Sequence, residues 1–281
     1  MIAAVVVLYN PDKNIVENLN SYIDCVEKIY VIDNSNFSNA SLFQDLPFAH
    51  KLEYVFNKGN LGIAKALNIG CELAIQQGMK WVLTMDQDSK FLNLNAVIVN
   101  QIYNMKDDSI ALYYPTYLIE GIVYDKYIKE NNAPIVVMTS GNFINLSIYK
   151  SIAGFEDKLF IDYVDIDYCL KIKVAGYKIA QLPDATLVHE LGQSKHVSFL
   201  SKKAIVTNHS SLRRYYITRN RLYVHKKYKN ISSVFNKIEK RIFINDILKI
   251  ILFEDDKILK FKSIVRGYLD YRKNKFGVYS K

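Results

Sequence analysis

The sequence predicts an α/β protein with a mostly parallel central sheet flanked by helices. Within the first ninety residues, short apolar runs alternate with stretches of helical periodicity. Continuous apolar strands that alternate with helices are typical of a parallel sheet covered on both faces. In addition, half of the 281 residues are hydrophobic and only 5 are proline, so the chain can bury a large core and is not disordered.

The predicted elements follow one another in a regular order. Strands are predicted at residues 2–8, 28–32, 52–56, 81–85 and 178–182. Helices are predicted at residues 11–22, 63–77, 212–227 and 238–253. Between residues 90 and 180 the pattern is mixed, and beyond residue 195 the strand signal fades. Because no low-complexity linker separates the last third, we expect it to pack against the core.

Charge divides the chain into two regions. Residues 1–194 hold 15 basic and 22 acidic side chains, a net charge of −7, whereas residues 195–281 hold 22 basic and 6 acidic, a net charge of +16. We therefore predict a ligand-binding and catalytic domain at 1–200 and a basic, aromatic-rich helical segment at 201–281. The uneven distribution argues against a protein that coats polyanions, and no nucleic-acid-binding motif is present, so nucleic acid is not an expected partner.

The cysteines and the amino terminus indicate a cytoplasmic location. Cys25, Cys71 and Cys169 are few, odd in number and far apart, which favours a reducing compartment. The apolar run at residues 1–8 has no basic flank and is too short for a signal peptide or a membrane span. Any membrane contact is therefore expected to be peripheral.

Polar residues follow three of the predicted strands, at Tyr9-Asn10, Asp33-Asn34 and Asp86-Gln87-Asp88. In parallel sheets ligands collect beyond the carboxyl ends of the strands. Asp86 and Asp88 supply the hard oxygen ligands that suit Mg²⁺ or Mn²⁺ bound to phosphate, although an acidic loop that caps a helix has the same pattern. Asp33 is suited to accept a pyrimidine N–H or a ribose hydroxyl, or to form an Asx-turn.

Two further loops carry candidate functional residues. The loop at residues 57–62 precedes a predicted helix and either presents backbone N–H groups to a ligand or simply makes a tight turn. It lacks the glycine patterns of dinucleotide-binding and P-loop proteins. Asp162, Asp165 and Asp167 form a second acidic cluster, in which one carboxylate is a candidate general base and the others cap a helix.

The last third of the chain offers two more candidates. A neutral His189 is suited to complete a metal shell begun by Asp88, although a lone histidine is more often only hydrogen-bonded. The run at residues 213–221 mixes cations with aromatics, which suits anionic lipid headgroups or a diphosphate. Alternatively, its tyrosines are core contacts and its cations only solvate the outer face.

The assembled motifs resemble family 2 glycosyltransferases of the GT-A fold, especially the bacterial rhamnosyltransferase branch that builds surface polysaccharides. The matching segments occur in family order and span most of the chain, at residues 6–10, 31–34, 57–68, 84–89, 139–142, 159–170, 189–192 and 214–220.

This resemblance implies roles for individual residues. The nucleotide base and ribose would be held by Tyr9, Asn10, Asp33, Asn60, Gly62 and Lys65, with Asp86 on the ribose side. Asp88, with His189, would ligate the metal ion that bridges the diphosphate. Ser140 and Gly141 would line the sugar pocket. The catalytic base of the family aligns with Asp165, preceded here by Val164 in place of the usual glutamate, and Asp162 and Asp167 stay open as alternatives.

The resemblance also implies an activity. We expect an inverting, Mg²⁺- or Mn²⁺-dependent transferase that moves L-rhamnose from dTDP-rhamnose to a saccharide acceptor, lipid-linked, in the synthesis of O antigen or capsule. The basic segment would dock at an anionic inner membrane surface, and a homodimer is compatible with the family. The alternatives are transfer of galactofuranose, glucose or an N-acetylhexosamine from a UDP donor, and a non-catalytic peripheral membrane scaffold.

Overall fold

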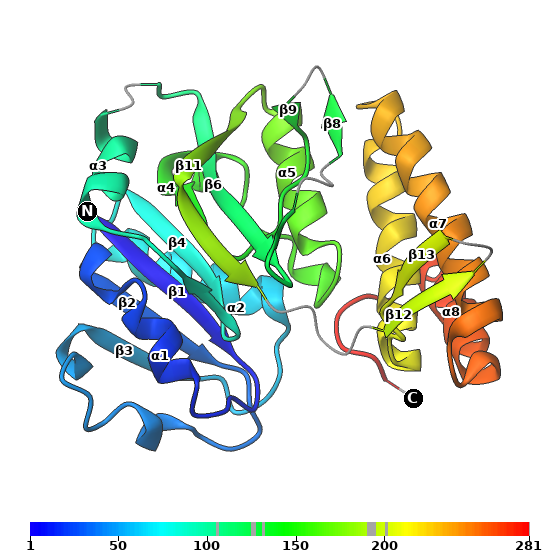
Figure 1. Cartoon of the computed structure of the whole chain (residues 1–281), viewed down its shortest axis with the longest axis horizontal. Helices are drawn as coiled ribbons and strands as arrows, with labels where there is room; N and C mark the ends of the chain where they lie inside the picture. Colours follow the sequence, from blue (N-terminus) through cyan, green and yellow to red (C-terminus); the bar gives the residue numbers. More distant parts are fainter. Residues whose placement is uncertain (105–106, 125–127, 131–132, 190–194, 200–201, 281) are drawn as a thin grey trace.

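A nine-stranded sheet forms the centre of the protein (Figure 1). The computed structural model describes residues 1–104, 107–124, 128–130, 133–189, 195–199 and 202–280. The strands run in the order β3-β2-β1-β4-β10-β6-β11-β5, with β7 beside β6. They comprise β1 (Ile2–Leu8), β2 (Lys28–Asp33), β3 (Leu52–Phe56), β4 (Trp81–Asp86), β5 (Ser89–Phe91), β6 (Ile110–Ile119), β7 (Ile122–Val123), β10 (Asn142–Asn145) and β11 (Lys178–His189).

The predicted α/β class is confirmed. Strands β3, β2, β1 and β4 pair in parallel, as do β6 and β11, whereas β10 and β5 pair with their neighbours antiparallel. All seven residues of β1 are buried, as expected for a strand covered on both faces. Helices α1 (Ile15–Asn20), α2 (Ile63–Gln76), α3 (Ala96–Asn104), α4 (Leu146–Ser151) and α5 (Val164–Val174) flank the sheet (Figure 1).

Three helices follow the sheet and stand together on one side of it: α6 (Ser211–Tyr228), α7 (Ser233–Phe253) and α8 (Lys257–Arg272) (Figure 1). Ser210 and Ser232 begin α6 and α7 by accepting hydrogen bonds from backbone N–H groups of the first turn. Val224, Tyr228 and Phe235 belong to the same buried cluster as the sheet residues. The expectation that the basic segment packs against the core is therefore confirmed.

Some elements differ from the sequence prediction. The helix predicted at 11–22 is shorter, because Asp12 accepts the Asn14 N–H in a local turn and α1 begins only at Ile15. The fading strand signal beyond residue 195 is misleading, since β12 (Lys195–Phe199) and β13 (Lys202–Val206) form an antiparallel hairpin. Lysines within these two segments obscured their apolar alternation. A second small hairpin pairs β8 (Lys129–Glu130) with β9 (Ala133–Pro134).

Strand register brings the polar strand ends to one edge of the sheet. Leu8 of β1 lies opposite Asp33 of β2, and Val7 lies opposite Asp86 of β4. The residues that follow β1, β2 and β4 are therefore level with one another, as the sequence predicted from parallel pairing.

Candidate active site

A cleft of about 700 Å³ opens at this edge of the sheet. Its walls come from the ends of β1 and β4, the loop before α2, the turn before α5, and the inward faces of α6 and α7. Of the predicted site residues, those that line it are Tyr9, Asn60, Gly62, Asp86, Asp88 and Asp165. The loops of the sheet and the carboxyl-terminal helices thus build a single site.

The end of β4 is held in place by the neighbouring strands. The Asp86 N–H donates to Ser140 Oγ at 3.0 Å. The Tyr9 N–H donates to Gln87 Oε1 at 2.8 Å, and Gln87 Nε2 donates back to the Tyr9 carbonyl at 3.3 Å. These contacts hold the backbone at the end of β4, where Asp86, Gln87 and Asp88 all line the cleft.

Ser140 and Gly141 are not among the residues described as lining the cleft. The two residues that precede them, Met138 and Thr139, do line it. Ser140 is buried and serves Asp86 as an acceptor. Gly141 has φ of 81°, and a Cβ there would lie 2.9 Å from the side chains of Leu187 and Pro115. Both residues therefore pack next to the residues that line the cleft, and their sugar-binding role stays a prediction.

Asp33 organises a buried turn. Its carboxylate accepts hydrogen bonds from the Ser35 N–H at 2.8 Å, the Asn39 N–H at 3.1 Å and the Tyr54 hydroxyl. Burial by itself would raise the pKa of Asp33, but these hydrogen bonds outweigh it and hold that pKa below its ordinary value. The Asx-turn alternative is therefore present, and nucleotide binding by Asp33 stays a prediction.

Asn10 belongs to the same turn region, because its N–H donates to Ser35 Oγ at 2.8 Å. Neither Asn10 nor Asp33 is among the residues described as lining the cleft, but their neighbour Asn34 is. Asn34 donates from its side chain to the Gly62 carbonyl at 3.1 Å and so joins this turn to the loop before α2.

The loop before α2 packs tightly against the turn before α5. The Gly62 N–H donates to Asn60 Oδ1 at 2.9 Å, and the Ile63 N–H donates to the Phe160 carbonyl at 2.6 Å. Gly62 has φ of +86°, and a Cβ there would lie 2.6 Å from the Phe160 carbonyl oxygen, so only glycine fits. Lys65 points elsewhere, forming an ion pair with Asp157 at 3.1 Å.

The three aspartates of the second acidic cluster have different environments. Asp162 lines the cleft but is paired with Arg213, whose Nη2 lies 3.0 Å from Asp162 Oδ1. Asp165 lies in the first turn of α5, is partly buried, and accepts the Ile166 N–H at 2.8 Å. Burial raises the pKa of Asp165 from 3.8 to about 6, and the nearby carboxylates of Asp162 and Asp86 contribute to this rise.

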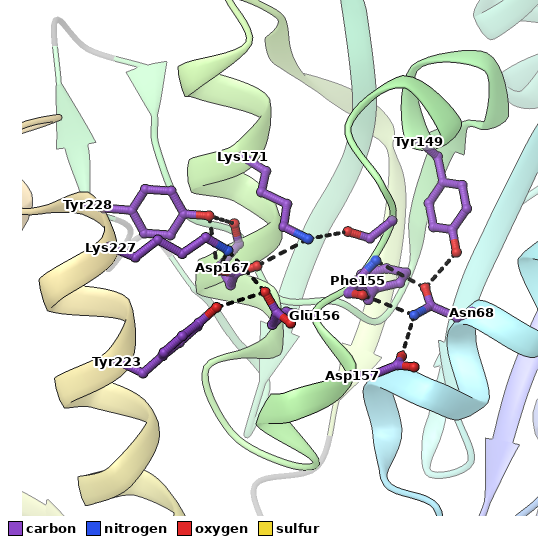
Figure 2. Close-up of polar contacts among 11 residues, drawn as sticks. Asn68, Tyr149, Phe155, Glu156, Asp157, Asp167, Lys171, Tyr223, Lys227 and Tyr228 are labelled. Atoms are coloured by element: carbon purple, nitrogen blue, oxygen red, sulfur yellow. Dashed lines mark hydrogen bonds and ion pairs between the residues drawn. The ribbon is translucent and has the colours of Figure 1, made fainter. Parts of the chain in front are cut away.

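Asp167 faces away from the cleft into the contact between α5 and α6 (Figure 2). It is fully buried, and its Oδ1 accepts from Lys227 Nζ at 2.7 Å and from the Tyr228 hydroxyl at 3.0 Å. Lys171 Nζ lies 3.6 Å from Oδ2. This network is structural. Asp162 and Asp165 both line the cleft, and burial raises the pKa of each, but the Asp162 carboxylate is held by Arg213. Asp165, with a pKa of about 6, therefore has the surroundings that better suit a general base.

The proposed metal ligands are only partly described. Asp88 lines the cleft. The backbone of His189 pairs with that of Ser89, the residue that follows Asp88. The side chain of His189 lies outside the described residues. Within the described regions of the chain, His, Cys, Asp and Glu side chains do not gather in a group of three or more that could hold a metal ion.

Cations of α6 line the cleft, which agrees with the predicted anion-binding surface and not with the alternative in which they only solvate an outer face. Arg213, Arg214 and Arg221 line it, and His209 does so just before the helix begins. Burial lowers the pKa of His209 to about 3, with a further contribution from nearby arginines and lysines, so its imidazole is neutral at physiological pH. No local pattern marks these cations, because the carboxylates that pair with them lie far along the chain, as Asp162 does from Arg213 and Glu254 from Arg214.

Comparison with known proteins decides the family. The chain is 31% identical over 238 residues, 78% of each sequence, to the dTDP-rhamnosyl transferase RfbF of Shigella flexneri. The chain belongs to glycosyltransferase family 2. The sequence pattern named Glycosyl transferase family 2 also matches residues 3–132. This protein is therefore a glycosyltransferase, and the resemblance to the rhamnosyltransferase branch is confirmed.

Solved structures of GT-A glycosyltransferases share the fold. S. aureus TarS 1-349 in complex with UDP-GlcNAc aligns with 96% of this chain and 80% of its own, at a TM-score of 0.59 and 16% identity. GalNAc-T7 with UDP, GalNAc and Mn²⁺ aligns with 80% of this chain and 47% of its own, at a TM-score of 0.57 and 14% identity. The predicted GT-A fold is thus confirmed.

The raised pKa of Asp165 predicts a pH-dependent stability change. Because the pKa in the folded state is about 6 and the ordinary value is 3.8, folding favours the protonated form, and the ionised carboxylate destabilises the protein above pH 6. Asp165→Asn should therefore raise Tm at about pH 8 by about 2–6 °C and have little effect at about pH 4. Thermal denaturation at both pH values tests this, and an equal shift at both would contradict it.

Proposed function

We propose that this glycosyltransferase moves L-rhamnose from dTDP-rhamnose to a hydroxyl of a saccharide acceptor with inversion at the anomeric carbon. The observation that supports the mechanism is the position of Asp165, which lines the same cleft as Asp86 and Asp88 and whose pKa burial raises to about 6. The donor proposal rests on the dTDP-rhamnosyl transferase of Shigella flexneri, to which the chain is 31% identical.

The proposed reaction is a direct displacement at the anomeric carbon. Asp165 removes the proton of the acceptor hydroxyl, and the resulting oxygen attacks the anomeric carbon from the face opposite the nucleotide diphosphate. The bond between the sugar and the diphosphate breaks as the new glycosidic bond forms, and the diphosphate leaves with the electron pair. In this proposal Asn60, Gly62 and Tyr9, which line the cleft, contact the nucleotide, and the neutral His209 lines the same cleft.

The residues present fit a divalent cation. Asp86 and Asp88 provide carboxylate oxygens at the cleft floor, the donor type that Mg²⁺ and Mn²⁺ prefer. The Asp86 charge contributes to the raised pKa of Asp165, so the two carboxylates are close enough to interact across the cleft. In our proposal Asp88 binds the ion, with His189, and Asp86 supports the ribose side. A bound ion would supply charge stabilisation for the departing diphosphate.

Removal of the Asp165 carboxylate should abolish most transfer. With purified dTDP-rhamnose and a saccharide acceptor, Asp165→Asn should lower kcat by about 10²-fold or more while dTDP binding changes little. In the wild type, kcat/KM should fall as the pH drops below about 6, because the base becomes protonated. The measurement is the initial rate of product formation across pH.

The matched control is Asp167→Asn, two residues along the same helix. Because Asp167 is paired with Lys227 and Lys171 away from the cleft, this variant should lower Tm but keep kcat within about threefold of the wild type. If Asp167→Asn or Asp162→Asn abolished transfer while Asp165→Asn kept it, the base assignment would be wrong.

Nucleotide and metal preference can be measured without an acceptor. We expect dTDP with Mn²⁺ to raise Tm more than UDP or GDP does, since a ligand that binds only the folded state stabilises it. Asp88→Ala should remove the Mn²⁺-dependent component of this shift and most activity. A larger response to UDP would favour a galactofuranose, glucose or N-acetylhexosamine donor, and no response to any nucleotide would favour the scaffold alternative.

The carboxyl-terminal helices have a surface suited to an anionic membrane, where we propose that a lipid-linked acceptor is met on the cytoplasmic side. None of the described helices has the length and apolar character that crossing a membrane requires. Large apolar side chains between 47% and 73% exposed lie on α7 and α8, among the lysines and arginines of the basic segment: Ile244, Leu248, Ile251, Leu252, Ile258 and Leu259. Apolar side chains mixed with cations are typical of helices that bind at a membrane interface.

Liposome flotation tests this docking surface. Binding should increase with the fraction of anionic lipid, and Ile258→Glu together with Leu259→Glu should reduce it, because two carboxylates would replace apolar side chains at the interface. Flotation that is indifferent to anionic lipid would contradict the proposal, as would light scattering that shows the same surface closed in a homodimer.

A further inference from the structure

The turn that precedes α5 has a strained backbone. Phe160, Asp162 and Tyr163 have positive φ angles of 63°, 61° and 67°. The Ile161 N–H donates to the Leu159 carbonyl at 2.7 Å, which closes a γ-turn around Phe160, where ψ is −66°. Residues other than glycine rarely adopt these conformations and keep them only where the surrounding structure fixes them. The turn leads directly into the first turn of α5, which carries Asp165.

One side chain of α6 binds three carbonyls of this turn. Asn220 is fully buried. Its Nδ2 lies 2.7 Å from the Leu159 carbonyl oxygen, 2.8 Å from that of Ile161 and 3.0 Å from that of Asp162. A single primary amide therefore satisfies the carbonyls that point inward from the strained segment.

The preceding residue, Arg219, fixes the orientation of this amide. Its Nε donates to Asn220 Oδ1 at 3.0 Å, and its Nη1 donates to the Gly277 carbonyl at 2.8 Å. The Arg219 guanidinium is fully buried and stacks near the rings of Tyr215 and Tyr216. If the amide were turned over, its Oδ1 would face three carbonyl oxygens. Only the observed orientation lets Nδ2 donate to these carbonyls while Oδ1 accepts from Arg219.

The other attachments of the turn show where it is held independently of Asn220. The Phe160 carbonyl accepts from Ile63 at the beginning of α2, and the Tyr163 hydroxyl donates to Glu239 of α7 at 2.6 Å. Further back, Asn68 of α2 binds the backbone of Phe155 (Figure 2). Between Phe160 and Tyr163, the carbonyls of Ile161 and Asp162 are bound by Asn220.

We propose that Asn220 is a positioning residue for glycosyl transfer, whose amide holds residues 159–163 in the conformation that presents the Asp165 carboxyl to the cleft. This inference rests on the proposed role of Asp165 as the base and extends it to a residue on another helix. Asn220 acts through backbone carbonyls and is not among the residues described as lining the cleft, so it is not a catalytic residue.

Asn220→Ala removes both donor hydrogens and tests the proposal. At saturating donor, kcat should fall by about 10- to 100-fold, because a displacement of a reacting group by about 1 Å costs up to about 10²-fold. The Kd for dTDP should change less than about threefold, because the contacts of Gly62 and Asn60 stay in place. The Asp165 pKa, measured by ¹³C NMR of aspartate-labelled protein with Asp165→Asn for assignment, should move from about 6 towards 3.8 as water reaches the carboxyl.

The control variant is Tyr228→Phe. It removes a buried hydrogen bond between α6 and α5, at 3.0 Å from Tyr228 to Asp167, but leaves residues 159–163 untouched. It should lower Tm while keeping kcat and the Asp165 pKa at wild-type values. The proposal is overturned if folded Asn220→Ala keeps wild-type kcat and a wild-type Asp165 pKa, or if Tyr228→Phe changes both as much as Asn220→Ala does.

A second variant covers the case in which Asn220→Ala does not fold. Glycine adopts positive φ without strain, so Asn220→Ala combined with Asp162→Gly should recover folded protein if the amide serves to hold the turn. Asp162→Gly alone is the reference for the lost ion pair with Arg213, and a double variant that fails to fold although Asp162→Gly folds would contradict the proposal. The NMR titration needs no sugar donor, so a wild type that transferred from no nucleotide-sugar would refute the proposed function while leaving the role of Asn220 testable.

Discussion

The packing of α6 against the turn before α5 is the interaction on which the site depends. Three residues of that turn have positive φ, and each such conformation costs about 1–3 kcal/mol. The two hydrogens of the Asn220 amide serve three carbonyls, and each net hydrogen bond contributes about 0.5–1.5 kcal/mol, so they offset only a fraction of the strain. Other contacts of the turn add to them, among them the bond between Ile63 and Phe160, the bond between Tyr163 and Glu239, and the stacking of Phe160 on Tyr216. The turn therefore requires α2 on one side and α6 on the other.

The same packing explains the uneven distribution of charge along the sequence. Cations of the basic segment pair with carboxylates of the acidic domain: Arg213 with Asp162, and Lys227 with both Asp167 and Glu156. Other cations pair within the segment, as Arg221 does with Asp246 at 2.9 Å. The net charges of −7 and +16 thus partly reflect the opposite sides of one internal interface.

Environment, rather than residue type, separates the three aspartates near the start of α5. Asp162 is neutralised by an arginine at the cleft wall, Asp167 is enclosed by two lysines and a tyrosine, and Asp165 reaches the cleft with a raised pKa. A carboxyl group with a pKa of about 6 takes up a proton more readily than an ordinary aspartate and is still mostly ionised at neutral pH. The two flanking carboxylates are held by ion pairs with α6, so a cluster that is uniform in sequence has three distinct environments in the fold.

The sequence by itself determined the α/β class, the parallel order of the first strands and the edge at which Asp86, Asp88 and Tyr9 meet, because apolar periodicity and parallel pairing are local and repetitive. It also determined the family, since motifs such as residues 57–68 and 84–89 occur in order. Only the tertiary structure decided which of Asp162, Asp165 and Asp167 faces the cleft, that Ser140 and Gly141 lie behind its floor, and that α6 shapes the turn before α5. These depend on contacts between residues about sixty positions apart, such as Asn220 with Leu159, and on burial, which no local pattern encodes.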